Sequence, residues 1–477
     1  MKRYLYITLT VVVVLAGVLF YRTTLRRSEF VILSTNDIHA SLDNFAALAT
    51  AVNACRDTVF TVVVDAGDRW TGNAYVDLAD GRLPIINLMN AVGYDVAALG
   101  NHDFDAGQEV LGGAVDRATF DVLCANMSGA SGKLGEVGKS EQIVTPEGVA
   151  IDFVGVVTSY MNGHPDGNDV NFEGLTFEDP QMVAERECKR LEGDVKVLLS
   201  HMGDDRDMEL AARYDGYNVI IGGHTHRVLD TLINGTTIGQ TGRKMKVVGA
   251  TRVKMRGRKV IGVEYENIPL KGYEKNSEVE HMIREIEENP ELQLVVGSMA
   301  HSINHVGLCN LQTKIIKEAT KSDIGIYHRG GVRIIEGLPE DDVTVKTLFD
   351  NEPFFSQVHT ALVTPAQLRK LIITKYNDET NTKESHRIDL YATTPYIIIV
   401  DQNDMAYNVL FPLLREGRKY RLAIADYVAR NYKNFECEEE VRTDLLVYDL
   451  DVEYFKKNSP VSISSEPLQR VVMRKKR

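Results

Sequence analysis

The sequence predicts an α/β fold for the first half of the chain, and three observations support this class. Apolar runs rich in Val and Ile alternate with amphipathic stretches from residue 30 to about residue 270. Several of the runs lack the polar alternation of a half-exposed strand, which is typical of strands buried on both faces. Segments with Asp, Asn and His follow five of the runs. We therefore expect a layered sheet that carries a site at the ends of its strands.

The expected elements follow one another as strand, helix and strand. Residues 247–262 predict a pair of strands at an antiparallel edge. Helical spacing of apolar residues predicts helices at residues 44–53, 83–92 and 181–191. Seven strands are expected before the edge, at residues 30–34, 60–65, 96–99, 120–123, 149–157, 195–199 and 219–221.

A chain of 477 residues is too long for one hydrophobic core, so more than one domain is expected. Residues 271–290 are dense in charge and place their apolar residues at helical spacing, which is typical of an exposed connecting helix. We therefore predict a first domain at residues 28–270, a linker at 271–300 and a second domain at 301–477. The second domain is expected to open with an amphipathic helix near residues 311–319.

The chain is acidic, with 54 Lys and Arg against 67 Asp and Glu and a formal net charge of −13. This balance argues against a nucleic-acid polymer or an anionic membrane surface as partner. It permits a small phosphorylated substrate, because bound cations set the local field of a metal site. The five cysteines are scattered and predict free thiols, with one disulfide left open: Cys55, Cys124, Cys188, Cys309 and Cys437.

The N-terminal region predicts export. Residues 1–27 hold five basic residues and no acidic one, around an apolar run at residues 4–21. A run of this length reaches the lower end of the roughly 17–25 residues that a spanning helix needs. We favour an uncleaved signal anchor over a signal peptide cleaved after Ala16. The chain is then anchored facing the periplasm or the outside, or secreted if cleaved, and this segment is its only expected membrane contact.

The five polar segments supply carboxylate, amide and imidazole groups, the ligands that hard and borderline divalent metals prefer. Asp37 and His39 are two residues apart, so in extended backbone their side chains point to the same side. His224 and His226 repeat this spacing. Four glycines are expected to let the backbone turn sharply beside the ligands: Gly67, Gly100, Gly222 and Gly223.

The set suffices for two divalent ions, which need a bridging carboxylate when they lie about 3.5–4 Å apart. Asp68 suits the bridging role. Asp37, His39 and one late histidine complete one ion. Asn101, His201 and the other late histidine complete the second.

His102 is left free of the metals in this arrangement. It is placed to donate a proton to a leaving alkoxide, and Asp105 is placed to hold the other nitrogen of its imidazole. A metal pair lowers the pKa of a bridging water toward about 7 and clamps phosphate oxygens. Each segment alone is weak support for a metal site, because Gly and Asn also cluster in turns. The ordered set of five is what predicts the site.

The ordered series D-x-H, G-D, G-N-H-[DE], a single His and G-H-x-H resembles the calcineurin-like metallophosphoesterase superfamily. Within it, residues 36–40, 100–105 and 222–226 resemble the 5′-nucleotidase and UDP-sugar hydrolase family. The resemblance extends over roughly residues 29–450. It implies a four-layer α/β/β/α catalytic domain, followed by a smaller α/β domain that recognises the substrate.

The resemblance also implies the cofactors and the roles of the site residues. Two divalent ions, zinc or manganese, would be bound. The catalytic dyad would be His102 and Asp105. One ion would be held by Asp37, His39, Asp68 and His226. The other would be held by Asp68, Asn101, His201 and His224.

The second domain carries candidate substrate-binding residues, and Asn101 of the first domain adds one more. Residues 328–333 resemble the family loop N-G-G-G-I-R, with His328 and Arg329 at its first two positions. Arg333 and its neighbour Arg329 would bind anionic groups of the substrate. A surface ion pair of Arg333 is the alternative.

Two aromatic residues complete the predicted recognition site. Residues 353–356 resemble P-F-G-N, with Ser356 in place of Asn, and residues 425–429 resemble N-D-F-L-A. Phe354 and Tyr427 would then sandwich a nucleobase, a contact worth about 1–3 kcal/mol. Ordinary core packing of both rings is the alternative.

The family loop G-G-D-G-Y is missing after residue 429, so hydrolysis is expected to be intact and recognition altered. The favoured function is hydrolysis of nucleoside 5′-monophosphates by attack of metal-bridging water. A 2′,3′-cyclic nucleotide phosphodiesterase and a nucleotide-sugar pyrophosphatase are alternatives of the same chemistry. A non-catalytic nucleotide-binding surface protein is the alternative of another class. The oligomeric state stays open.

Three further features could have a purely structural role instead of a functional one. His164 is expected to be a loop histidine. Trp70, the only tryptophan, lies near Asp68 and either lines the pocket or packs in the core. The acidic run at residues 204–207 is expected to be a solvated loop or a helix cap rather than a set of extra ligands.

Overall fold

The computed structural model describes residues 24–129, 132–159, 163–378, 387–431 and 435–474. The chain divides into two compact units, Met1–Glu288 and Asn289–Arg477. The apolar run predicted to be a signal anchor or signal peptide lies outside the described residues. None of the helices in the described ranges has the length and apolar character needed to cross a membrane.

The first unit contains two six-stranded mixed sheets. In the first sheet, the order is β14-β13-β1-β2-β3-β4; β1 to β4 run parallel, and β13 is antiparallel to both β1 and β14. Its strands are β1 (Arg27–Thr35), β2 (Thr61–Asp65), β3 (Val96–Ala98), β4 (Asp121–Leu123), β13 (Val247–Arg256) and β14 (Lys259–Pro269).

The second sheet has the order β11-β12-β10-β9-β7-β6, with parallel central strands and an antiparallel strand at each edge. Its strands are β6 (Ser140–Val144), β7 (Ala150–Val157), β9 (Val195–His201), β10 (Val219–Gly222), β11 (Val228–Ile233) and β12 (Thr236–Thr241). All seven strands expected before the edge are therefore present in one sheet or the other.

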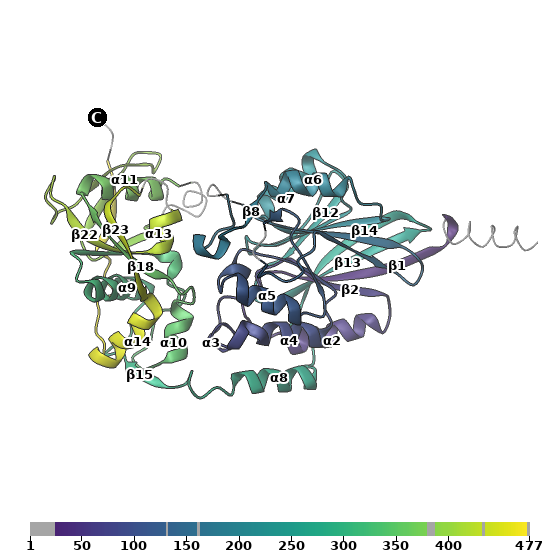
Figure 1. Ribbon diagram of the computed structural model, residues 1–477, viewed down its shortest axis with the longest axis horizontal. Coiled ribbons are helices and arrows are strands. Elements are labelled where there is room, and N and C mark those ends of the chain that lie inside the picture. The colour runs from purple at the N-terminus through teal and green to yellow at the C-terminus, as the bar shows by residue number, and fades with distance from the viewer. Residues whose placement is uncertain (1–23, 130–131, 160–162, 379–386, 432–434, 475–477) are drawn as a thin grey trace, which may run out of the picture. The chain divides into compact units, whose positions relative to one another are not determined.

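Helices cover the outer face of each sheet, which gives four layers in the order α/β/β/α (Figure 1). The four-layer class expected from the resemblance is confirmed. Against the first sheet lie α2 (Phe45–Arg56), α4 (Leu83–Val92), α5 (Gln108–Arg117) and α8 (Ser277–Glu287). Against the second sheet lie α6 (Pro180–Cys188) and α7 (Asp204–Arg213).

Alternating side chains divide each central strand between two cores. In β1, Val31 and Leu33 pack against the helices, while Phe30 and Ile32 pack between the two sheets. Both sets are buried, so the strand is apolar throughout, as expected for a sheet covered on both faces. Helix α8 belongs to the same core, because Val279 and Ile283 are buried with the residues of α2 and α4.

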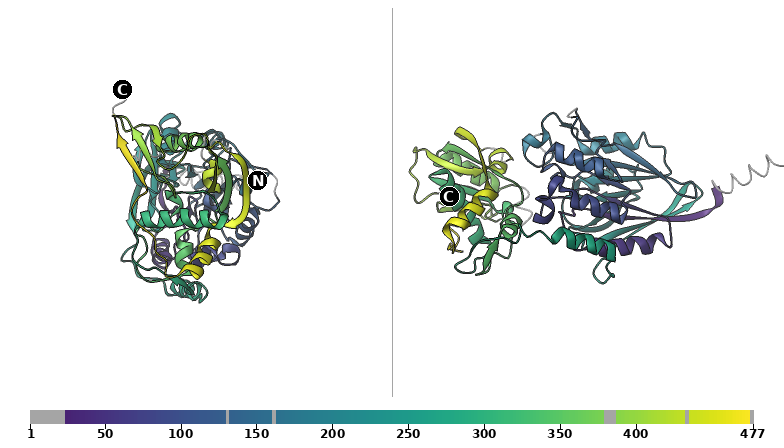
Figure 2. Two further views of the ribbon diagram at one scale, coloured as in Figure 1. Left: turned by 90° about the vertical axis from the view of Figure 1, so that its left-hand side faces the viewer. Right: turned by 60° about the horizontal axis from the view of Figure 1, so that its bottom comes forward.

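The second unit is built on a five-stranded sheet of order β19-β16-β22-β18-β23 (Figure 1; Figure 2, green to yellow). A three-stranded sheet of order β21-β20-β24 and a pair β15-β17 accompany it. The strands are β15 (Val295–Ser298), β16 (Ile324–His328), β17 (Asp342–Thr344), β18 (Gln357–Val363), β19 (Leu390–Ala392), β20 (Tyr396–Val400), β21 (Ala406–Leu410), β22 (Tyr420–Ala425), β23 (Glu438–Leu446) and β24 (Gln469–Met473).

Two hydrophobic cores lie on opposite faces of this five-stranded sheet. One contains α9 (His305–Thr320), α10 (Val345–Asn351) and α14 (Val447–Asn458), and the other contains α11 (Pro365–Tyr376) and α13 (Asp426–Asn431). The helix expected near residues 311–319 is α9, and it begins earlier than predicted. Its start is fixed by Asn304, whose side chain accepts a hydrogen bond from the Gly307 backbone amide.

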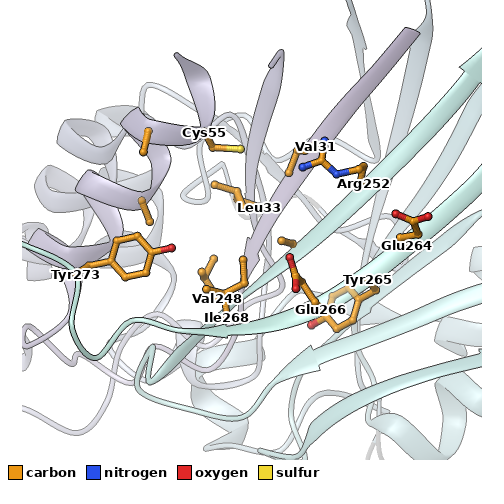
Figure 3. Close-up of a pocket in the computed structure, with 13 residues that line it drawn as sticks. Val31, Leu33, Cys55, Val248, Arg252, Glu264, Tyr265, Glu266, Ile268 and Tyr273 are labelled. Atoms are coloured by element: carbon orange, nitrogen blue, oxygen red, sulfur yellow. The ribbon is translucent and has the colours of Figure 1, made fainter. Parts of the chain in front are cut away.

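A groove of about 410 Å³ lies beside α2, on the part of the first sheet formed by β1, β13 and β14 (Figure 3). Its walls include apolar residues such as Val248 and Ile268 and the charged side chains of Arg252 and Glu266. None of the predicted site residues lines this groove. The chemistry expected from the sequence is therefore located elsewhere.

The core between the two sheets should contribute strongly to stability. Phe153 of β7 is fully buried there, so Phe153→Ala should lower the free energy of unfolding by about 3–5 kcal/mol, measured by urea denaturation. Val144 on the edge strand β6 is 55% exposed. Val144→Ala is the matched control and should change stability by no more than about 0.5 kcal/mol. Equal effects of the two substitutions would contradict this packing.

Candidate active site

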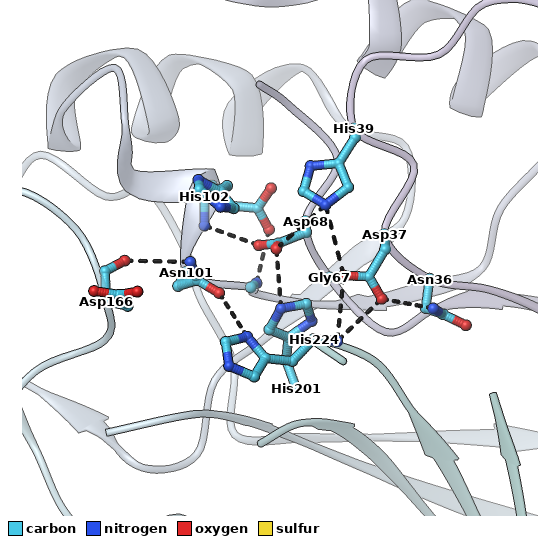
Figure 4. A network of polar contacts seen from close by, with 12 residues as sticks. Asn36, Asp37, His39, Gly67, Asp68, Asn101, His102, Asp166, His201 and His224 are labelled. Atoms are coloured by element: carbon cyan, nitrogen blue, oxygen red, sulfur yellow. Dashed lines mark hydrogen bonds and ion pairs between the residues drawn. The ribbon is translucent and has the colours of Figure 1, made fainter. Parts of the chain in front are cut away.

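The predicted metal ligands all lie at the carboxyl ends of parallel strands in the first unit. Asp37 and His39 follow β1, Asp68 follows β2, and Asn101 follows β3. The remaining three come from the second sheet, where His201 ends β9 and His224 and His226 follow β10. Figure 4 shows the side chains of Asp37, His39, Asp68, Asn101, His201 and His224 pointing toward one another.

The first cluster consists of Asp37, His39 and His226. The two imidazole Nε2 atoms of His39 and His226 lie 2.9 Å apart. Asp37 Oδ1 lies 3.4 Å from Nε2 of His226 and 3.8 Å from Nε2 of His39. One ligand atom from each residue thus lies within 4.8 Å of the other two, a spacing suited to a single ion.

The second cluster consists of Asp37, Asp68 and His201. Asp68 Oδ2 lies 3.1 Å from Nε2 of His201 and 3.9 Å from Nε2 of His39, so this carboxylate faces both clusters. Asn101 Oδ1 lies 3.0 Å from Nδ1 of His224. The structure therefore brings together all seven residues that the sequence analysis singled out as ligands.

The histidine ring orientations fit a bound cation. Nδ1 of His39 faces the Thr71 carbonyl at 3.2 Å, and Nδ1 of His201 faces the Ala66 carbonyl at 2.7 Å. A carbonyl only accepts hydrogen bonds, so these contacts place the proton of each neutral ring on Nδ1. In a neutral ring the unprotonated Nε2 then faces the cluster, toward His226 for His39 and toward Asp68 for His201. Nε2 of His201 is buried and lies 3.1 Å from Asp68 Oδ2, so a cation bound here would contact both atoms.

The electrostatics of the site reflect crowded carboxylates and imidazoles. Burial lowers the pKa of His39 to about 3. Burial also opposes the charged form of His201, but the Asp68 and Asp37 carboxylates outweigh burial and raise its pKa to about 10. Burial would raise the pKa of Asp68, yet His201 and the other nearby histidines hold it well below its usual value. Such opposing shifts within one cluster are typical of functional sites.

His102 lies beside these clusters and is held by a second carboxylate. Its Nδ1 is 2.8 Å from Asp105 Oδ2, and the Thr71 hydroxyl donates to the same oxygen at 2.6 Å. The backbone N–H of His102 donates to Asp68 Oδ1 at 2.8 Å. The imidazole side chain is 27% exposed. The predicted pair of His102 and Asp105 is thus in contact.

The backbone at the ligands is not extended, contrary to the sequence-based reasoning. Five ligand candidates have left-handed φ angles between 47° and 78°: Asp37 (50°), His39 (47°), Asp68 (61°), His224 (78°) and His226 (56°). Asp and His tolerate this region better than most residues. Backbone hydrogen bonds hold it, because Asp37 N–H donates to Gly67 O at 2.9 Å and His39 N–H donates to Asp68 O at 3.0 Å.

The glycines beside the ligands are required for close approach more than for sharp turns. Of the four expected to turn, only Gly67 has a left-handed φ, of 94°. A Cβ on Gly100 would lie 2.2 Å from Asp68 Oδ1, and a Cβ on Gly223 would lie 2.8 Å from Nδ1 of His201. Because these two glycines have no side chain, Asp68 and His201 can occupy the space beside them.

A buried ionic network that the sequence does not predict lies behind the ligand loops. The Arg69 guanidinium is 1% exposed and contacts Asp103 Oδ2 at 2.8 Å and the Ala98 carbonyl at 2.7 Å. Asp103 also accepts from the backbone amides of Arg69 and Gly100. This network joins the loop after β2 to the loop after β3. The only signal in the sequence was Asp103 itself, within the G-N-H-D motif.

Asn36 makes the corresponding connection between the two sheets, and it was also missed. Its amide nitrogen donates to Asp37 Oδ2 at 2.6 Å and to the Gly242 carbonyl at 2.7 Å. Its amide oxygen accepts from the backbone and the hydroxyl of Thr241 at the end of β12. Asn36 therefore orients the Asp37 carboxylate and ties it to the second sheet.

Three of the substrate-binding candidates of the second unit make ring contacts: Arg333 with Phe354, and Tyr427 with His328. The Arg333 guanidinium lies 5.4 Å from the centroid of the Phe354 ring. The buried His328 ring stacks on Tyr427 at 4.7 Å, so one face of Tyr427 is already covered by this chain. Arg329 donates its backbone N–H to the Asp389 carbonyl at 2.7 Å.

Trp70, His164 and the acidic run at residues 204–207 have structural roles in the first unit. Trp70 is 2% exposed and donates its Nε1–H to the Arg82 carbonyl, so it packs in the core. His164 lies in a loop and stacks on Phe172 at 4.5 Å. The acidic run at residues 204–207 forms the first turn of α7, and its Asp207 is fully buried rather than solvated. All five cysteines are free thiols.

A four-layer α/β/β/α domain with this set of carboxylates and imidazoles at its strand ends is a metallophosphoesterase domain. Comparison with known families agrees, because residues 30–228 match the calcineurin-like phosphoesterase family. Residues 295–440 match the 5′-nucleotidase C-terminal domain. The chain therefore combines a calcineurin-like phosphoesterase domain with a 5′-nucleotidase C-terminal domain.

Two bacterial relatives illustrate how much of the chain is matched. The chain is 26% identical over 401 residues to the trifunctional nucleotide phosphoesterase protein YfkN of Bacillus subtilis, covering 72% of this chain and 27% of that protein. It is 25% identical over 519 residues to Protein UshA of Yersinia enterocolitica, covering 91% and 92%. The chain thus spans less than a third of the length of YfkN and nearly all of UshA.

Solved structures share the fold of the whole chain. The 5′-nucleotidase precursor of Thermus thermophilus aligns with a TM-score of 0.78 at 19% identity, covering 93% of this chain and 99% of that chain. A putative 5′-nucleotidase of Staphylococcus aureus aligns with a TM-score of 0.79 at 16% identity, covering 94% and 100%. At these identities the comparison establishes the fold alone.

The close approach at Gly100 should make this residue sensitive to a single methyl group. Gly100→Ala should displace the Asp68 carboxylate and weaken metal binding by about 10–100-fold, as supporting residues of metal sites do. Gly113 in α5 has no heavy atom within 4 Å of an added Cβ. Gly113→Ala is the control and should leave metal binding unchanged while stabilising the helix by about 0.5–1 kcal/mol. Metal titration followed by melting temperature distinguishes the two, and unchanged binding in Gly100→Ala would contradict the geometry.

Proposed function

We propose that this protein is an exported, metal-dependent phosphoesterase that hydrolyses nucleoside 5′-monophosphates. The observation that carries the proposal is the convergence of Asp37, His39, Asp68, His201 and His226, with imidazole Nε2 atoms close to shared carboxylates. The 5′-nucleotidase C-terminal domain supports a nucleotide as the substrate. Export rests on the apolar run at residues 4–21 between basic clusters.

The donor set suits two divalent ions, with zinc and manganese as the proposed metals. Such ions supply Lewis acidity toward phosphate oxygens and lower the pKa of a water molecule. One ion would be held by Asp37, His39, Asp68 and His226. The other would be held by Asp68, Asn101, His201 and His224.

His102 is the proposed proton donor to the leaving oxygen. Asp105 holds its Nδ1, so Nε2 is the atom that would carry the proton toward the substrate. Thr71 fixes the Asp105 carboxylate and thereby the orientation of the ring. A non-catalytic nucleotide-binding protein would have no use for this pair, and the presence of every predicted ligand together with His102 favours an enzyme.

The second domain, proposed to span residues 301–477 beyond a linker at 271–300, would recognise the nucleotide. Arg333 and Arg329 would bind anionic groups of the substrate, with Asn101 contributing from the catalytic domain at residues 28–270. Phe354 and Tyr427 would contact the base. His328 already covers one face of Tyr427, so a base would have to stack on the other face of this ring.

A substrate panel tests the proposed function. The full-length protein with manganese or zinc should release phosphate from nucleoside 5′-monophosphates, and a chelator should abolish the release, because the proposed ligands bind metal and not substrate alone. Release only from 2′,3′-cyclic nucleotides or from nucleotide sugars would replace the monophosphate by one of these alternatives. No release from any of them, with no metal bound, would overturn the proposal.

The role of His102 has its own test. His102→Ala should lower kcat for the preferred nucleotide by about 10²–10⁴-fold, the usual contribution of a general acid, while the metal content per chain stays unchanged. His281 on α8 is 64% exposed and lies outside the site, so His281→Ala is the matched control and should retain full activity. Loss of metal in His102→Ala would instead make His102 a ligand.

A further inference from the structure

The end of helix α10 is a junction between two loops of the second unit. One loop, at residues 328–333, carries Arg333, and the other, at residues 353–356, carries Phe354. Glu352 is the C-cap residue of α10, lies between these loops in the sequence and is fully buried. A buried carboxyl group is costly unless it is hydrogen-bonded, so its partners indicate what it does.

Glu352 joins the two loops through a single oxygen atom. Its Oε1 accepts a hydrogen bond from the Tyr327 hydroxyl at 3.0 Å and another from the Ser356 hydroxyl at 2.6 Å. Tyr327 lies in β16 near the start of the first loop, and Ser356 ends the second loop. Both hydroxyls are in buried residues, so neither contact is exchanged freely for water.

Further contacts fix the same junction. The backbone N–H of Arg333 donates to the Asn351 carbonyl at 2.9 Å, which attaches the far end of the first loop to α10. The Arg333 guanidinium lies 5.4 Å from the Phe354 ring, which links the two loops at their functional residues. The Ser356 carbonyl accepts from the Val447 backbone at 2.9 Å and anchors the second loop to α14.

The chemistry of Glu352 shows that the carboxylate is retained at a cost. Burial raises its pKa to about 7, although the hydroxyls of Ser356 and Tyr327 act against burial. Its second oxygen, Oε2, has no hydrogen-bond partner among the described residues. An apolar side chain would avoid the cost of burying a carboxyl group and of leaving Oε2 without a partner. It would, however, leave the hydroxyls of Tyr327 and Ser356 without their shared acceptor. The contact also accounts for Ser356, which stands where the P-F-G-N pattern has Asn.

We propose that Glu352 is a positioning residue for substrate recognition, which holds the Arg333 loop and the Phe354 loop at the spacing that a bound nucleotide requires. The inference rests on the proposed function for the identity of the ligand. Glu352 acts through Tyr327 and Ser356 and does not touch the substrate. It is independent of the metal ligands, all of which belong to the first unit.

Two substitutions at Glu352 test the proposal. Glu352→Ala should raise the Kd and the KM for a nucleoside 5′-monophosphate by about tenfold, because both hydroxyls lose their acceptor. The kcat for p-nitrophenyl phosphate, which has no base for the recognition loops, should stay within about twofold of the wild type. Glu352→Gln should restore nucleotide binding to within about threefold, because its amide oxygen accepts both hydroxyl hydrogens.

Asp451 supplies the matched control. It is a carboxyl of α14 in the same core, 2% exposed and hydrogen-bonded to the Gln312 side chain at 2.8 Å, with no contact to either loop among the hydrogen bonds described. Asp451→Asn should leave the Kd for the nucleotide unchanged. If Glu352→Ala does not fold, judged by its melting temperature, the double variant Tyr327→Phe, Ser356→Ala removes the same two hydrogen bonds and should raise the Kd to a similar extent.

The outcomes separate this inference from the proposed function. Unchanged nucleotide binding in Glu352→Ala, or equal weakening in Asp451→Asn, would overturn the positioning role. Calorimetry on the wild type with a chelator present measures nucleotide binding without turnover, so a wild type that binds the nucleotide there but does not hydrolyse it with metal overturns only the proposed function. A wild type that hydrolyses p-nitrophenyl phosphate but binds no nucleotide overturns both the proposed nucleotide substrate and the role of Glu352 in nucleotide recognition.

Discussion

The buried ion pair of Arg69 and Asp103 is the interaction on which the candidate active site depends. Both groups are almost fully buried, and together they fix the backbone of the loops after β2 and β3. Asp68 and Asn101, the ligands in those loops, take their positions from this pair. A buried pair of this kind contributes little net stability, but removal of one partner leaves an uncompensated charge and costs about 3–5 kcal/mol. The pair therefore sets geometry more than it adds stability.

The left-handed backbone of the ligands follows from the same requirement for fixed geometry. A residue other than glycine in a sparsely populated backbone region destabilises the folded state by about 1–3 kcal/mol. Such strain persists only where the surrounding structure fixes the conformation. Here the loop after β1 runs along the loop after β2 with three successive backbone hydrogen bonds, from Asp37, His39 and Ala40. The side chains converge because these backbone hydrogen bonds fix the loops, and not because the residues alternate along a strand.

Sequence reasoning found what depends on local pattern and missed what depends on distant partners. The strands were predictable because both of their faces are apolar, and the ligands were predictable because Asp and His follow those runs. Arg69 and Asp103 are 34 residues apart, and nothing in the spacing pairs them. The first turns of α9 were missed because polar residues such as His305 and Asn310 are buried there. Glu352 was missed because its acceptor role depends on Tyr327, which lies 25 residues earlier and in another element.

The division of the ligands between two sheets has a mechanical consequence. Asp37, His39, Asp68 and Asn101 belong to one sheet and His201, His224 and His226 to the other, so ions held by both sets would act as cross-links between the two layers. Ligand present at about 1,000 times its Kd adds about 4.1 kcal/mol to the stability of the state that binds it. The five cysteines of this chain form no disulfide. Ions bound between the layers would therefore serve as its cross-links, and the free energy of unfolding would depend on the metal concentration.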